Sequence, residues 1–218
     1  MPRSPSTCLV RLYHTPCCLA LELRVQLYIN GHDMETIDTM KSRRAVREYF
    51  DAPVARETIE RLAGAAILAP SAMNLQPWAF AATLDRDAIS RYAKQIKGWL
   101  LANFSQTSLP PSLRTLIEPE SYNVLHNAPA IVLVLAKSME PQASEDCCLA
   151  AENLMLAARD EGLGTCWIGL SRPWFNLTST KRELGLPEQY EVVAPIILGY
   201  PKAWPESHGR NPAEIHWI

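Results

Sequence analysis

The stretch Ala130-Ile131-Val132-Leu133-Val134-Leu135-Ala136 decides the fold class of this 218-residue chain. It is an uninterrupted aliphatic run, partly β-branched, and its lack of polar alternation predicts a strand that is covered on both faces. This run is the expected central strand of a sheet. The sequence therefore predicts a single α+β domain in which helices pack on a mixed sheet.

Apolar spacing on either side of this strand alternates between helical and strand periods, without an internal repeat or a low-complexity segment. The pattern predicts helices at residues 56–68, 85–100, 143–160 and 179–184, a first helix from residue 34 to a basic cluster at residues 43–47, and strands at residues 78–83, 165–170 and 192–198. Residues 103–121 contain three prolines and no clear period, so we expect a lid or a surface excursion there. The tail at residues 200–218 has too little periodicity for its own core and is expected to lie over another part of the protein.

Charge and cysteine content exclude several classes of protein. The formal charge is −2, so no global field attracts nucleic acid, and any anion site must be local. The six cysteines include two adjacent pairs and no C-x-x-C, which argues against a zinc ribbon, thioredoxin-like chemistry or a secreted disulfide framework. A reducing, cytoplasmic location is therefore predicted.

Residues 1–33 differ from the rest of the chain, because their apolar pattern is irregular and they hold half of the cysteines. We interpret them as a non-conserved extension or the product of an upstream start codon, and a weak organelle-targeting sequence is the alternative. Met34 would then open one domain at residues 34–218. The uncharged stretch between Arg61 and Asp85 is long enough to cross a bilayer, but prolines and polar residues break it, so no membrane partner is expected.

The basic cluster at residues 43–47 is the first candidate site. Arg43 and Arg47 are four residues apart and would share a helix face if the helix persists. Two guanidiniums at that spacing could bind a phosphate, because each presents fixed donors and stays charged. The alternative is a solvated basic face.

The second candidate is the loop at residues 69–78, where polar side chains stand between Pro70 and Pro77. Such side chains could bind the imide edge of a heterocycle or a ribityl hydroxyl, and ordinary turn chemistry is the alternative. The glycines at residues 162–169 follow a helix rather than a strand, so we interpret them as a helix C-terminus that leads into a strand, not as a dinucleotide fingerprint. Cys166 has no nearby His or Asp, which favours a small buried hydrophobe over a nucleophile.

Several recognisable catalytic patterns are absent from the sequence. The five histidines show no metal-ligand spacing, and there is no G-x-S-x-G or Walker A sequence. We therefore expect no metal site and no catalytic side chain. An anion-binding cluster without a catalytic constellation is typical of a protein whose cofactor does the chemistry.

Taken together, these segments resemble the flavin-dependent nitroreductase family in order and spacing, over residues 34–218. The matching segments are Arg43-Arg44-Ala45-Val46-Arg47, Ala69-Pro70-Ser71 with Asn74 and Gln76-Pro77-Trp78, Gly162 to Gly169, Leu198-Gly199-Tyr200-Pro201, and Arg210. The resemblance implies a three-layer α/β/α sandwich around a mixed, mainly antiparallel sheet, with a domain-swapped C-terminal arm. It also implies an FMN-binding homodimer with two active sites, each built from both chains.

The resemblance assigns cofactor contacts to twelve positions. The cluster arginines would hold the FMN phosphate and the pyrimidine end of the flavin, the C-terminal arginine would close on the phosphate, the proline-flanked loop would come from the partner chain, and the backbone at residues 167–169 would lie against the flavin. The twelve are Arg43, Arg44, Ala45, Arg47, Pro70, Ser71, Asn74, Gln76, Trp167, Ile168, Gly169 and Arg210. Two positions depart from the family pattern, since Ala45 stands where serine is usual and His208 stands near a common second basic residue.

The implied activity is a ping-pong reaction. NADH or NADPH would give hydride to FMN and leave, and a nitroaromatic, a quinone or a similar electron-poor small molecule would then take its place. Met73, Trp167 and residues 103–121 would shape the acceptor slot, and core packing is the alternative role for Trp167. The alternatives are a flavin-binding or flavin-processing protein, and a specialised reductive dehalogenase or dehydrogenase on the same fold.

Overall fold

The computed structural model describes residues 34–107 and 109–218, and the extension predicted at residues 1–33 lies outside them. Asp85 caps α4 (Arg86–Asn103) by accepting hydrogen bonds from the backbone N–H groups of Asp87 and Ala88, and Gly162 follows α6 (Pro141–Asp160) with a positive φ of 76°. The elements are α2 (Thr36–Ser42), α3 (Arg56–Ala66), η1 (Ala72–Asn74), β1 (Trp78–Thr83), α4 (Arg86–Asn103), η2 (Phe104–Gln106), α5 (Pro111–Ile117), β2 (Ala130–Ala136), α6 (Pro141–Asp160), β3 (Gly164–Trp167), η3 (Gly169–Ser171), α7 (Arg172–Phe175), α8 (Thr178–Glu183) and β4 (Glu191–Gly199).

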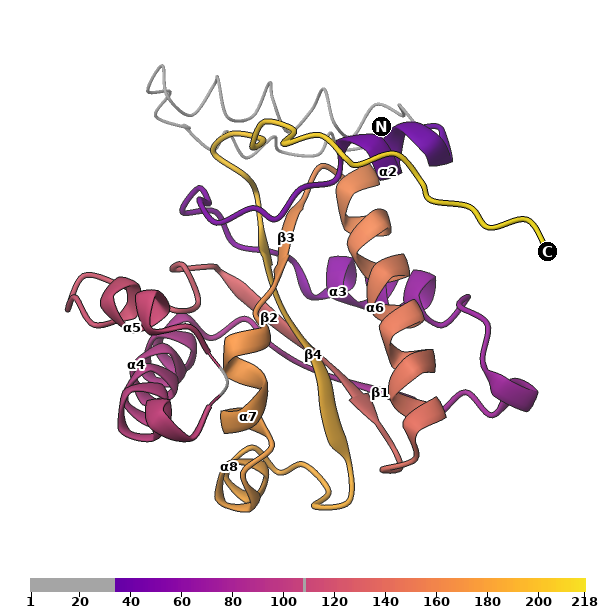
Figure 1. Ribbon diagram of the computed structural model, residues 1–218. Coiled ribbons are helices and arrows are strands. Elements are labelled where there is room, and N and C mark those ends of the chain that lie inside the picture. Colours follow the sequence, from indigo (N-terminus) through magenta and orange to yellow (C-terminus); the bar gives the residue numbers. More distant parts are fainter. Residues whose placement is uncertain (1–33, 108) are drawn as a thin grey trace, which may run out of the picture. The chain divides into compact units, whose positions relative to one another are not determined.

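The four strands form one sheet in the order β1-β2-β4-β3, and every neighbouring pair is antiparallel (Figure 1). The sequence predicted a mixed, mainly antiparallel sheet. In the described part of the chain, parallel pairing is confined to an isolated bridge between Ala45 and Thr165. β2 is an interior strand, as its aliphatic run predicted.

Helices cover both faces of the sheet, which accounts for the absence of alternation in β2. Val132 and Val134 pack into a core cluster with residues of α3 and α6. Ile131, Leu133 and Leu135 point to the opposite face, where they pack with residues of α4, α5 and α7. The sheet and the helices on its two faces therefore form the three layers of an α/β/α sandwich (Figure 1).

Two short helices were not predicted. Residues 103–121 were expected to be a lid or an excursion, but they contain η2 and α5, and Ile117 of α5 is fully buried. α7 was missed as well, and its Trp174 and Phe175 are buried in the same cluster. The described part of the chain contains no helix that combines the length and the apolar character needed to cross a membrane.

Candidate functional site

The basic segment at residues 43–47 leaves the helix and runs beside the sheet. α2 ends at Ser42, and Arg43 has extended dihedral angles, φ −61° and ψ 133°. Ala45 forms the parallel bridge with Thr165 of β3, and the Val46 N–H donates to the Thr165 carbonyl at 2.9 Å. The predicted placement of Arg43 and Arg47 on one helical face is therefore wrong. In an extended segment, alternate residues point to the same side, so these two arginines can still share a side.

Close packing against β3 fixes this segment. A Cβ atom added to Gly164 would lie 2.6 Å from Val46 Cγ2, so only glycine allows the segment to approach so closely. The buried Tyr49 hydroxyl also donates to the Val46 carbonyl at 2.6 Å. Burial raises the pKa of Tyr49, which keeps its hydroxyl protonated as a donor.

The arginines of the segment have unused donors. Arg43 Nε lies 3.2 Å from Glu152 Oε1 of α6, and Arg44 Nη1 donates to the carbonyls of Lys41 and Arg43. The Nε atoms of Arg43 and Arg44 are both buried and have no hydrogen-bond partner among the described residues. Arg43 Nε is offset by the ion pair with Glu152, but Arg44 Nε has no such contact within the described residues. Buried donors are nearly always paired in folded proteins, so the two arginines fit an anionic ligand at this position.

The positive charges of the basic segment affect the pKa values of side chains near Arg47. Burial raises the pKa of the Cys166 thiol, and the nearby charges of Arg47 and Arg43 only partly offset that shift. Burial and the charge of Arg47 lower the pKa of His126, so this imidazole is neutral at pH 7. Cys166 is therefore a poor nucleophile, in agreement with its interpretation as a buried hydrophobe.

The segment at residues 167–169 continues from β3, next to the basic segment. Trp167 is half-buried at the end of the strand, and the Ile168 N–H already donates to the Pro195 carbonyl at 2.8 Å. Gly169 is exposed, and a Cβ atom added there would meet nothing within 4 Å. Of these three residues, Gly169 has open space beside its backbone where a flat ligand could lie.

Replacing Gly169 with valine tests this space. We expect the unliganded variant to unfold within about 2 °C of the wild type, since the new side chain meets no neighbour and its cost stays below ~0.5 kcal/mol, as is usual for open surface sites. Affinity for FMN should fall at least tenfold, because the side chain occupies the space beside the backbone. Thermal unfolding and FMN fluorescence titration measure the two effects. Unchanged affinity would contradict a ligand position beside Gly169.

The loop at residues 70–76 has an unusual backbone. Met73, Asn74 and Gln76 have positive φ values of 50°, 55° and 48°, a region that non-glycine residues rarely adopt. Inside the loop, Ser71 Oγ accepts from the Gln76 N–H at 3.0 Å, and Asn74 Oδ1 accepts from Gln76 Nε2 at 3.1 Å. Pro70, Asn74 and Gln76 are exposed, and Ser71 is half-buried.

The loop and the basic segment contact different sides of α6. Asp146 contacts the loop at Ala72, whereas Glu152 contacts Arg43 and Arg159 contacts Ser42. Glu152 and Arg159 are seven residues apart and share one helix face, and at 3.6 residues per turn Asp146 lies roughly 120° around the helix from Glu152. Within the described residues, no hydrogen bond or ion pair joins the loop to residues 43–47.

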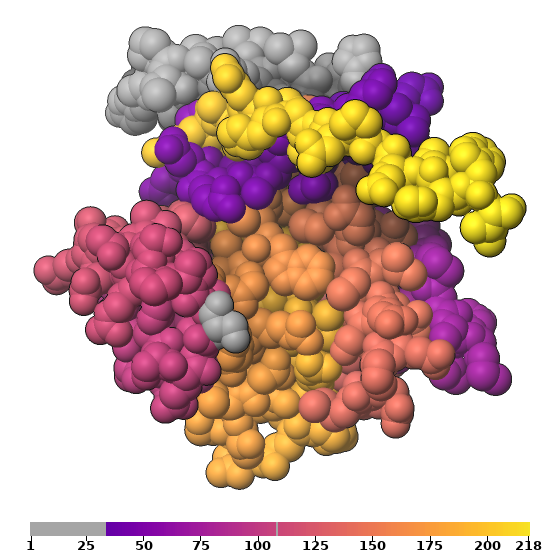
Figure 2. Space-filling model, viewed as in Figure 1, coloured from indigo at the N-terminus to yellow at the C-terminus, as the bar shows by residue number. Residues whose placement is uncertain are grey.

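Arg210 lies on the C-terminal arm, residues 200–218. The arm begins beside the basic segment, since the Phe50 N–H donates to the Tyr200 carbonyl and the Lys202 N–H donates to the Glu48 carbonyl (Figure 1). The Arg159 guanidinium lies over the Trp204 ring, 3.9 Å from its centroid. Beyond this point the arm is exposed, and Figure 2 shows it (yellow) running across the surface and ending at the edge of this view.

Arg210 itself is exposed, and its Nη1 donates to the Gly209 carbonyl. No contact between Arg210 and residues 43–47 is present in the described chain. His208 is also exposed. The structure therefore brings the basic segment and residues 167–169 together, and leaves the loop and Arg210 apart from them.

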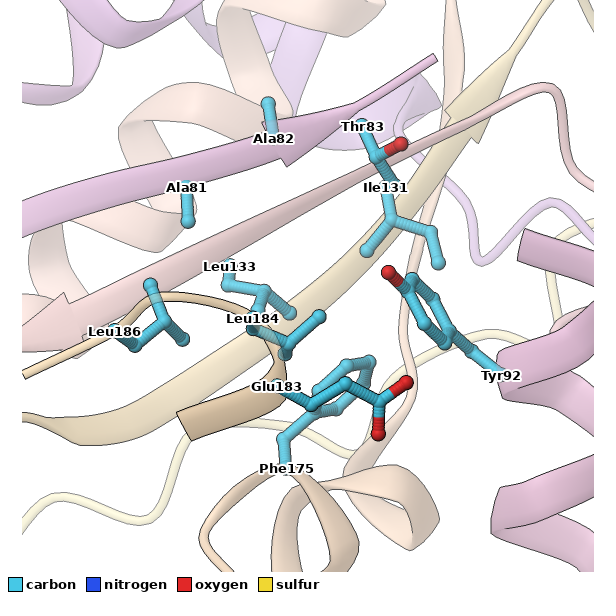
Figure 3. Close-up of a pocket in the computed structure, with 10 residues that line it drawn as sticks. All are labelled: Ala81, Ala82, Thr83, Tyr92, Ile131, Leu133, Phe175, Glu183, Leu184 and Leu186. Carbon is cyan, nitrogen blue, oxygen red and sulfur yellow. The ribbon is translucent and has the colours of Figure 1, made fainter. Parts of the chain in front are cut away.

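A cavity of about 240 Å³ lies elsewhere, between β1 and β2 on one side and α4, α7 and α8 on the other. In Figure 3 its lining is largely apolar, with the hydroxyls of Tyr92 and Thr83 and the carboxylate of Glu183 as polar groups. None of the twelve predicted site residues lines it. The described residues contain no group of three or more His, Cys, Asp or Glu side chains that could hold a metal ion.

Sequence reasoning missed the residues of α6 that contact the site. Glu152, beside Arg43, and Asp146, beside the loop, lie on an Ala-rich helix whose pattern predicts packing alone. The only available signal was that Asp146 occupies a position on the buried face of this helix, where aspartate is rarely found without a partner.

Comparison with known proteins identifies the fold and the chain's relatives. A "Putative NADH dehydrogenase/NAD(P)H nitroreductase" of Archaeoglobus fulgidus is 32% identical over 194 residues, covering 84% of this chain and 97% of that protein. The 5,6-dimethylbenzimidazole synthase of Rhodospirillum rubrum is 28% identical over 177 residues, covering 73% and 79%. The crystal structure of a nitroreductase with bound FMN from Bacteroides fragilis superposes with a TM-score of 0.73 at 27% identity, covering 85% of this chain and 99% of that one. Residues 40–200 match the nitroreductase family, and the chain therefore belongs to that family.

Proposed function

We propose that this protein is an FMN-dependent NAD(P)H oxidoreductase that reduces small electron-poor acceptors such as nitroaromatics and quinones. The observation that carries this proposal is that the buried Nε atoms of Arg43 and Arg44, on a segment held against β3, make no hydrogen bond within the described residues. Arg43 Nε has an ion-pair contact with Glu152 at 3.2 Å. Together with family membership and the FMN-bound relative, these atoms support an anionic cofactor at this position.

The residues present fit FMN. The phosphate would be held by Arg43, Arg44 and Arg47, with Arg210 closing from the arm. The backbone at Gly169, with open space beside it, would lie against the flavin ring. Ala45 offers a methyl group where the family usually has a hydroxyl, so its contribution is limited to packing and to its backbone.

When bound, FMN supplies the hydride chemistry, by accepting hydride from NADH or NADPH and passing it to the acceptor in a ping-pong sequence. The side chains bind and orient, and none needs to act as an acid or a base. His126, neutral and half-buried near Arg47, adds no positive charge to the phosphate-binding group. Trp167, Met73 and the segment at residues 103–121 would shape the acceptor slot. Met73 is 92% exposed, which leaves its side chain available for such a contact.

We also propose a homodimer in which each site combines the basic segment of one chain with the loop of its partner. The loop and the basic segment lie on different sides of α6, which supports their participation in two separate sites. The arm carries exposed apolar residues at its end, Ile215, Trp217 and Ile218, which a partner surface could cover in a domain swap.

Mixing two inactive variants tests the shared site. After dialysis and without added FMN, an Arg43→Ala chain and a chain with Asn74→Ala and Gln76→Ala should each lack the cofactor and be inactive as homodimers. In a heterodimer one site carries both defects and the other carries none, so random mixing should restore roughly a quarter of the wild-type activity. The assay is NAD(P)H oxidation with a nitroaromatic after joint unfolding and refolding. A mixture that stays inactive would contradict the shared site, as would full activity in strict monomers.

Anaerobic reduction tests the proposed chemistry. The purified protein should be yellow or take up added FMN, NADH or NADPH should bleach it, and a nitroaromatic should restore the colour. A colourless preparation that FMN does not restore would refute the oxidoreductase. A protein that binds FMN but resists NADH and NADPH would instead favour flavin processing, or a specialised dehalogenase or dehydrogenase.

A further inference from the structure

We propose that Asp146 of α6 is a positioning residue that holds the loop at residues 71–76 in its flavin-binding conformation. This inference rests on the function proposed above. Both carboxylate oxygens of Asp146 lie 3.2 Å from the Ala72 backbone nitrogen, which donates to them from the first residue of η1. The contact joins residues 74 positions apart in the sequence, and it ties the loop to a long helix of the core.

The loop needs such an anchor because its backbone is strained. Three of its non-glycine residues, Met73, Asn74 and Gln76, have left-handed backbone angles. These cost about 1–2 kcal/mol each for Met73 and Gln76, and less for Asn74, because asparagine tolerates this region better. Such conformations persist only where the surroundings fix them. The remaining hydrogen bonds of the loop are local, such as the one that the Gln76 N–H donates to Ser71 Oγ, so they move with the loop and cannot hold it against the helix layer.

Burying the Asp146 side chain costs free energy that an apolar residue at this position would not. The residue is 7% exposed, and no Lys, Arg or His side chain pairs with it in the described part of the chain. A buried carboxylate without a cation costs free energy, and one backbone donor compensates it incompletely. Alanine is the residue that packing alone would favour at this position, because other buried positions of the helix are alanines: Ala143, Ala150 and Ala151. The cost is explained if the carboxylate places the loop residues that contact the flavin.

The test separates the loop from the phosphate site by using two ligands. Riboflavin lacks the phosphate but has the ring and the ribityl chain, so it reports on the loop without the phosphate contacts of the arginines. We expect Asp146→Ala to weaken the binding of FMN and of riboflavin by the same factor, at least tenfold. Asp146→Asn keeps an acceptor oxygen and should restore affinity to within about threefold of the wild type. Glu145→Ala, an exposed acid next in the helix, is the matched control and should leave both affinities unchanged.

A second measurement does not depend on a ligand. Amide hydrogen exchange of the unliganded protein should rise at residues 72–76 in Asp146→Ala by at least tenfold, while the strands of the sheet keep their protection. If the alanine variant does not fold, Asp146→Ser takes its place in both experiments.

The outcomes distinguish this inference from the proposed function. Wild-type affinities and wild-type loop exchange in a folded Asp146→Ala protein would overturn the inference, and so would an Asp146→Asn variant as weak as the alanine. A wild-type protein that binds neither FMN nor riboflavin would refute the proposed function, and the exchange data would still decide whether Asp146 holds the loop.

Discussion

Arg43→Ala is expected to bind FMN about 10- to 100-fold more weakly than the wild type, because a hydrogen bond to a charged group contributes roughly 1.5–3 kcal/mol. The Arg43 Nε is buried without a hydrogen-bond partner, and its side chain is positioned by an extended backbone and by Glu152. The loss should appear as colourless protein after dialysis. Turnover per bound FMN should stay near the wild-type value, since the role proposed for this arginine is to bind the cofactor and not to take part in hydride transfer.

Ligand and variant controls make this prediction specific. Riboflavin affinity should be unchanged in Arg43→Ala, because the missing contact is to the phosphate. Arg56→Ala removes an exposed arginine on α3 that pairs only with Glu60 among the described residues, and it should bind FMN normally. An Arg43→Ala protein that remains fully yellow after dialysis would refute the phosphate role of this residue.

Gly164→Val is expected to destabilise the fold by about 3 kcal/mol, at the upper end of the range for overpacked cores. A Cβ atom at this position would lie 2.6–2.8 Å from three atoms of Val46, whose β-branched side chain is stiff and 1% exposed. The basic segment must then move away from β3. We expect the midpoint of thermal unfolding to fall by roughly 6–12 °C. FMN affinity should fall as well. Gly169→Val should also lose FMN affinity, but its unfolding midpoint should stay within about 2 °C of the wild type.

The control is Gly98→Val on α4, where an added Cβ meets nothing within 4 Å. This variant should unfold within about 2 °C of the wild type, because valine fits an exposed helix position at least as well as glycine. Equal stability of the two valine variants would refute the close approach of Val46 to Gly164.

The sequence predicted those parts of the fold that depend on local pattern. The aliphatic run of β2 predicted an interior strand with its correct bounds, and Gly162 predicted the end of α6, because both signals act within a few residues. The extended path of the basic segment was not predictable in this way. It depends on a glycine about 120 positions later in the chain, at which the backbone can approach closely.

The candidate site was predictable to a similar extent. Its charged and polar side chains were identified from their motifs, but the contacts that position them come from α6, through Asp146, Glu152 and Arg159. α5 was missed because its seven residues are flanked by prolines and carry a single buried position, Ile117, too little for a helical period to emerge.

The bridge between Ala45 and Thr165 also affects how far the edge of the sheet is exposed to solvent and to other polypeptide chains. β3 is an edge strand, and its outer side would otherwise present free N–H and C=O groups to any extended peptide. The basic segment covers that edge and adds positive charge to it, a combination that discourages strand addition by another molecule. Protection against aggregation and the proposed recognition of an anion therefore depend on the same few residues, so a variant that frees this segment should lower solubility as well as binding.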